Sequence, residues 1–106
     1  MPPPSGLLAK VIERWAKLRM PKKSLNDELL RAIELALSGE WEGAHNLVQQ
    51  HEDDAVAAWI HAVLHKIEGD LGNAGYWYRR AGRMDRMGEE SQGELRAIRE
   101  KISVKS

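Results

Sequence analysis

A chain of 106 residues is long enough for one domain with a modest core and too short for two. Its 16 Lys and Arg residues balance its 16 Asp and Glu residues, so no net positive charge attracts nucleic acid, and we expect no nucleic-acid partner. The chain has no Cys, which excludes disulfides and Cys-ligated zinc, and no apolar run near the ~20 residues of a membrane span, so we expect a cytoplasmic protein without a membrane contact.

The beginning of the chain divides into two parts. Residues 1–5 are rich in Pro, are predicted to be disordered, and lack the basic and apolar stretches of a secretory signal. A single all-α domain is predicted over residues 6–104. Its first helix is expected at residues 6–20, where apolar side chains recur at helical spacing, and Pro21 ends it.

Five further helices are predicted from apolar periodicity and from capping residues. They are expected to begin near Ser24 or Asn26, Glu40, Asp53 or Asp54, Asp70, and Glu89. Gly39, Gly69 and Gly82 are expected to end three of them, and the last helix is expected to reach residue 104. No alternating strand pattern occurs, so the fold class is all-α, with about six helices and no sheet.

The central helices contain an internal repeat with a period of 30 residues. Three small residues carry it: Ala32, Gly39 and Ala44 recur as Ala62, Gly69 and Ala74. Small residues allow two antiparallel helices to approach closely, and Gly ends a helix where φ is positive. The spacing therefore predicts two helical hairpins of similar design over residues 25–86.

These positions resemble the signature of the tetratricopeptide repeat. The second hairpin matches it at Ala62, Gly69, Leu71, Ala74, Tyr78 and Ala81, and the first less fully at Ala32, Gly39, Trp41, Ala44 and Val48. The period of 30 departs from the usual one of about 34, His51 stands where a small residue is expected, and both repeats lack the closing Pro. The resemblance implies two stacked hairpins with flanking N- and C-terminal helices. Residues 55–83 also resemble a group of small microbial proteins, which implies no activity.

Tetratricopeptide-like stacking implies that the first helix of each hairpin lines a concave groove. The expected lining is apolar: Leu29, Leu30, Ile33, Leu37, Val56, Trp59, Ile60, Val63 and Ile67. A groove so apolar needs a cover, and the helix at 6–20 is the nearest candidate, either as permanent core or as a cover that a partner helix displaces. The last helix is expected to cap the end of the stack or to pair with a second copy.

Three polar residues of the fourth helix suggest a metal site. His61, His65 and Glu68 lie at i, i+4 and i+7 and so share one face, which we expect roughly opposite the apolar stripe. The alternative is that they are partly exposed helix residues, or that one ring caps a helix end or stacks on Tyr76 or Trp77. His45 can join them only if its helix packs beside this face.

The fifth helix carries the candidate partner-binding residues. Tyr76, Arg79 and Arg80 lie off its apolar stripe and could clamp a carboxylate or a phosphate. The alternative is that the Arg residues of this region stabilise the helix C-terminus and pair with Asp85, Glu89 or Glu90.

No nucleophile with a base and no phosphate-binding loop occurs, so we expect neither an enzyme nor an organic cofactor. The favoured function is a small interaction or adaptor module that binds a protein or peptide partner, or itself, through Trp59, Tyr76, Arg79 and Arg80. The alternative is a sensory or catalytic metal site at His61, His65 and Glu68.

Overall fold

The computed structural model describes residues 24–104, and over this range the protein is all-α, as predicted. The α-helices are α2 (Leu25–Leu37), α3 (Trp41–Gln49), α4 (Ala55–Ile67), α5 (Leu71–Ala81) and α6 (Ser91–Val104), with a short 3-10 helix η1 (Met84–Arg86). None of the described residues forms a strand. The predicted lead at 1–5 and helix at 6–20 lie outside the described residues.

Three of the helices begin at side chains that bond the free N–H groups of the first turn. Ser24 accepts a hydrogen bond from the Asp27 N–H at 3.1 Å, and the Asp27 carboxylate accepts one from the Ser24 N–H. Asp54 caps α4, and Asp70 caps α5. Because such a cap contributes about 1 kcal/mol, these residues fix where each helix starts.

The turns after α2 and α4 have the same geometry thirty residues apart. Gly39 and Gly69 both have φ of 85°, a conformation that favours Gly. The N–H three residues beyond the end of each helix bonds back across the turn, Glu40 to the Leu35 carbonyl at 2.8 Å and Asp70 to the His65 carbonyl at 2.9 Å. The sequence repeat thus corresponds to a repeated turn, while the tetratricopeptide resemblance stays a prediction.

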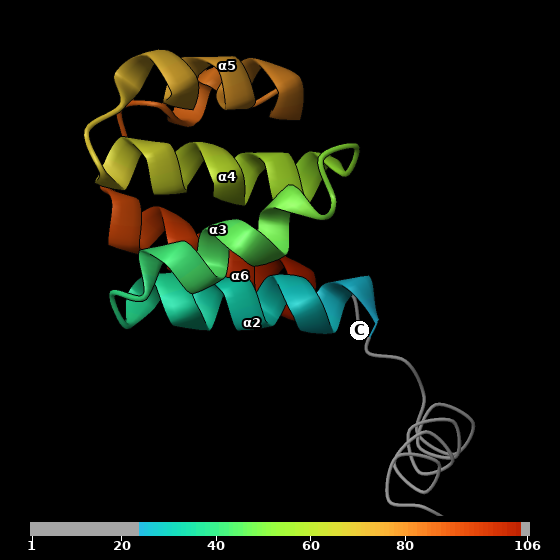
Figure 1. The fold of residues 1–106 in the computed structure, drawn as a ribbon. Helices are drawn as coiled ribbons and strands as arrows, with labels where there is room; N and C mark the ends of the chain where they lie inside the picture. The colour runs from blue at the N-terminus through green and yellow to red at the C-terminus, as the bar shows by residue number, and fades with distance from the viewer. Residues whose placement is uncertain (1–23, 105–106) are drawn as a thin grey trace, which may run out of the picture.

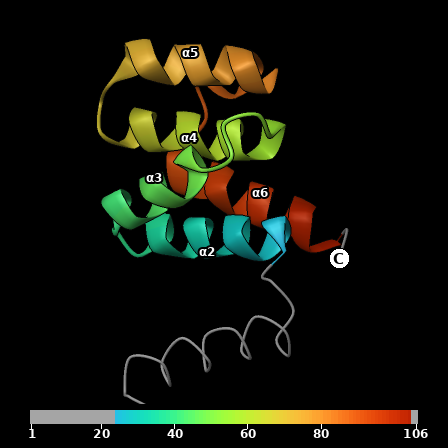
Figure 2. The same ribbon diagram turned by 45° about the vertical axis from the view of Figure 1, so that its right-hand side comes forward.

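Helices α2, α3, α4 and α5 lie one above another, and α6 lies behind α3, between the levels of α4 and α2 (Figure 1). The turned view shows the same order (Figure 2). Helix α6 packs against α2 and α4 and buries Leu95, Ile98 and Ile102 among their apolar side chains. The expectation that α6 caps the end of the stack is therefore wrong. Helix α6 instead covers faces of α2 and α4, the helices expected to line the groove.

A buried carboxylate fixes α6 to the rest of the core. Glu94 is 1% exposed and accepts hydrogen bonds from Trp59 Nε1 at 2.7 Å, from the Tyr78 hydroxyl at 2.8 Å and from Lys66 Nζ at 2.7 Å. Lys66 also donates to the Glu89 carbonyl at 2.7 Å. Every oxygen of the buried carboxylate is thus satisfied by donors from α4 and α5.

Trp59 lies in this core and is 4% exposed, because its Nε1–H bonds Glu94 and its ring is flanked by Arg83 and Lys101. It therefore offers no exposed surface to a partner, in contrast to its predicted role. None of the described helices has the length and apolar character that crossing a membrane requires.

Candidate metal centre

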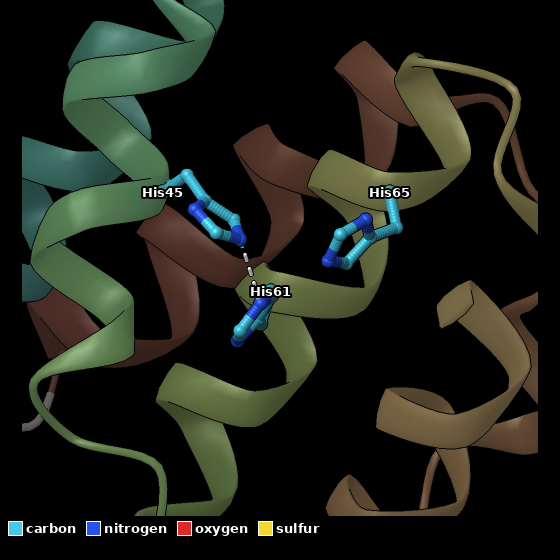
Figure 3. Close-up of side chains that lie close together, drawn as sticks. All are labelled: His45, His61 and His65. Atoms are coloured by element: carbon cyan, nitrogen blue, oxygen red, sulfur yellow. Dashed lines mark hydrogen bonds between the residues drawn. The ribbon is translucent and has the colours of Figure 1, made fainter.

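Three imidazoles converge between α3 and α4. His45 projects from α3, and His61 and His65 project from successive turns of α4 (Figure 3). One ring nitrogen from each residue can be chosen so that all three lie within 4.8 Å of one another. His61 Nε2 and His45 Nε2 are 3.0 Å apart and share one proton in a hydrogen bond. Helix α3 packs beside this face of α4, so His45 meets the condition for joining the site.

The cluster lies inside the protein. His61 is 2% exposed, His65 is also buried, and His45 is half-buried. The expectation that the His residues lie opposite a single apolar stripe is wrong, because residues 57–65 of α4 are all buried. Helix α4 contacts α2, α3, α5 and α6 and so has little free face.

Two indole rings flank the imidazoles. Trp41 stacks on His45, with ring centroids 4.5 Å apart and planes 12° apart. His61 stacks on Trp77 at 3.9 Å and 15°, as one of the alternative interpretations of this His expected. The imidazoles are therefore held in fixed planes between aromatic neighbours.

Glu68 contacts the cluster through His65. Its Oε1 lies 2.8 Å from His65 Nδ1, and Asp70 Oδ2 lies 3.9 Å from the same nitrogen. A carboxylate beside Nδ1 favours the tautomer with the proton on Nδ1, which leaves the lone pair of Nε2 free to bind. Glu68 and Asp70 also form a group with His65 that could hold an ion, so Glu68 as a ligand stays a prediction. In the cluster with His45 and His61, its hydrogen bond to Nδ1 can instead orient His65.

Burial keeps the imidazoles of His45 and His61 neutral. Removal from water, together with the smaller effects of the neighbouring His45 and His65, lowers the pKa of His61 to about 3. Burial likewise lowers the pKa of His45, with His65 adding to the effect and Glu68 opposing it. Buried His61 Nδ1 has no hydrogen-bond partner among residues 24–104. At neutral pH, His45 and His61 therefore offer uncharged nitrogen donors.

Acid should destabilise the metal-free protein through His61. Unfolded His61 has a pKa near 6.5 and binds a proton that the folded form does not take up until about pH 3. Stability is thus complete above pH 6.5 and decreases as the pH falls, by about 2 kcal/mol between pH 7 and pH 5. Urea unfolding in the presence of a chelator measures this change. The His61→Gln variant should show a flatter pH dependence, and an identical slope in both proteins would contradict the assignment.

The predicted partner-binding residues of α5 lie together on the surface. Tyr76 is 45% exposed, and Arg79 and Arg80 are also exposed. Arg80 donates to the Tyr76 hydroxyl at 3.2 Å and to the Glu52 carbonyl at 3.1 Å, so it ties α5 to the turn before α4. Arg80 pairs with Asp53, before α4, and not with the acidic residues after α5. Arg86 does pair with Asp85 and Glu89, as the alternative interpretation expected of the Arg residues of this region.

Sequence reasoning did not identify Trp41 as a neighbour of the site. It is the repeat position that opens α3, and its i, i+4 spacing from His45 is the signal that could have indicated the ring stack. Comparisons with protein-family models, with curated proteins and with solved structures found no match to this chain.

Proposed function

We propose that this protein binds one divalent transition-metal ion through His45, His61 and His65. The observation that supports this most is the convergence of three imidazoles, with one nitrogen from each within 4.8 Å of the others, inside a folded core. A single buried His is commonly a core residue with a hydrogen-bond partner. Three buried imidazoles that face one another can, in addition to their stacking and hydrogen-bond contacts, direct a nitrogen lone pair each at one ion.

The spacing and the donor type favour zinc-like ions. Zn²⁺ binds imidazole nitrogen at 2.0–2.1 Å, so two nitrogens of a tetrahedral site lie about 3.3 Å apart. The His45 to His61 nitrogen distance of 3.0 Å is close to this value. Neutral imidazoles suit Zn²⁺, Cu²⁺ and Ni²⁺ better than Mg²⁺ or Ca²⁺, which prefer oxygen.

The contact that Glu68 makes with His65 also suits an ion. Ligating imidazoles usually donate their other N–H to a carboxylate, and Glu68 lies in that position at His65. Three protein ligands leave a fourth position for water or another molecule, which a catalytic use requires. The interaction role of Tyr76, Arg79 and Arg80 stays a separate prediction.

Zinc titration of tag-free protein against a chromophoric chelator tests the proposal. Wild-type protein should bind one ion, and the His61→Ala/His65→Ala variant should bind at least about 100-fold more weakly because it keeps one ligand of three. His51→Ala is the matched control. His51 is the fourth His of the chain, bonds Glu28 at 2.9 Å and lies outside the cluster, so its loss should leave the affinity unchanged. Equal binding by wild type and the double variant would contradict the proposal.

A further inference from the structure

His45 differs from the other two candidate ligands in how it is held. His61 and His65 lie one turn apart on α4, so a single rigid helix sets their separation. His45 comes from α3, sixteen residues before His61, and is only half-buried. Its position relative to the other two therefore depends on how α3 docks on α4 and on which way its ring is turned.

Trp41 contacts both α4 and the His45 ring. Its Nε1–H donates to the Leu64 carbonyl at 2.6 Å, a bond from the first residue of α3 to the last turns of α4. Its indole lies flat on the His45 ring at 4.5 Å, one turn along the same helix. The edge of the indole also meets His65 at 5.9 Å. One side chain thus joins the two helices, orients the ligand of α3 and touches a ligand of α4.

We propose that Trp41 is a positioning residue that presents His45 to the ion, so that the three-imidazole site depends on the indole as well as on the ligands. This inference rests on the proposed function. Without the indole, the His45 ring can turn away from α4, and the site is reduced to the His61 and His65 pair. Residues that orient metal ligands typically contribute roughly 10- to 100-fold to affinity, and we expect a loss of that size.

A double-mutant cycle between Trp41 and His45 tests this role. Trp41→Leu alone should weaken zinc binding roughly 10- to 100-fold, about as much as His45→Ala alone. In the His45→Ala background, Trp41→Leu should weaken zinc binding by less than about twofold, because its effect depends on His45. A general loosening of the fold would instead weaken binding in both backgrounds.

Electron paramagnetic resonance of the Cu²⁺-loaded proteins gives a second readout. The spectrum of wild type is expected to show hyperfine splitting from three imidazole nitrogens, and that of Trp41→Leu is expected to show splitting from two. Trp41→Phe keeps a ring over His45 without the Nε1–H donor, and should retain three nitrogens with an intermediate affinity. This variant keeps the test decisive if Trp41→Leu folds poorly.

Leu71→Ala is the matched control for Trp41. Leu71 opens α5 as Trp41 opens α3, thirty residues later, and is 58% exposed. Its loss should leave the affinity unchanged. Suppose that wild type binds zinc, that the affinity of Trp41→Leu is within twofold of it, and that three nitrogens remain in the spectrum of the variant. The inference about Trp41 is then overturned while the metal site stands. If wild type itself binds no ion, both are overturned.

Discussion

Replacing Glu94 with Ala is expected to lower the free energy of unfolding by about 3–5 kcal/mol, the range found when one partner of a buried ion pair is removed. The carboxylate is fully enclosed and serves three donors: Trp59 Nε1, the Tyr78 hydroxyl and Lys66 Nζ. Without it, two buried neutral donors and one largely buried ammonium lose their acceptor, and α6 loses its polar attachment to α4 and α5.

Urea unfolding followed by circular dichroism measures the effect of Glu94→Ala. The matched control is Glu34→Ala, because Glu34 also forms an ion pair, with Arg99 at 2.9 Å, on the exposed surface. That variant should lose less than about 1 kcal/mol. A loss below about 1 kcal/mol for Glu94→Ala as well would mean that the buried network does not hold α6 in place.

Zinc is expected to stabilise the folded protein by about 4 kcal/mol when free zinc is 1,000 times the dissociation constant. The gain arises because the three nitrogens converge only in the fold: His45 and His61 are sixteen residues apart and come from different helices. The unfolded chain has no such site and should bind the ion far more weakly.

The measurement compares urea midpoints with excess zinc and with a chelator, at one pH and one protein concentration. Zinc should raise the urea midpoint of wild type strongly and should leave that of His61→Ala/His65→Ala unchanged. The His51→Ala variant should behave as wild type, because His51 bonds Glu28 away from the cluster. If zinc raised the urea midpoint of the double variant as much as that of wild type, the ion would bind at another site.

The helices of residues 24–104 could be predicted closely because local residues decide them. Ser24, Asp54 and Asp70 cap helices as expected, and Gly39 and Gly69 adopt the positive φ that their turns require. These signals act within four or five residues, so sequence shows them directly.

The position of α6 and the burial of α4 could not be read in the same way. The apolar residues of α6 indicate a buried face but not which helices cover it, and the core partners of Leu95 and Ile98 are far away in sequence. The buried role of Glu94 was not foreseen, because a Glu near the start of a helix usually faces solvent.

The histidine cluster proposed to bind a metal was predictable in part. The i, i+4 spacing of His61 and His65 identified two of the three imidazoles and their common side of α4. The third, His45, depends on the docking of α3 against α4, which no local pattern specifies. Glu68 does lie beside His65, at 2.8 Å from Nδ1, but spacing alone could not show whether its carboxylate would bind an ion or orient the imidazole.

X-ray absorption spectroscopy of the zinc-loaded protein at neutral pH tests the central claim most directly, because it counts the imidazoles around the ion. Three imidazole nitrogens at about 2.0 Å are expected in wild type, with one light-atom ligand completing the shell, and two imidazoles in His45→Ala. A shell made of oxygen ligands, or one that His45→Ala leaves unchanged, would contradict a site formed by His45, His61 and His65.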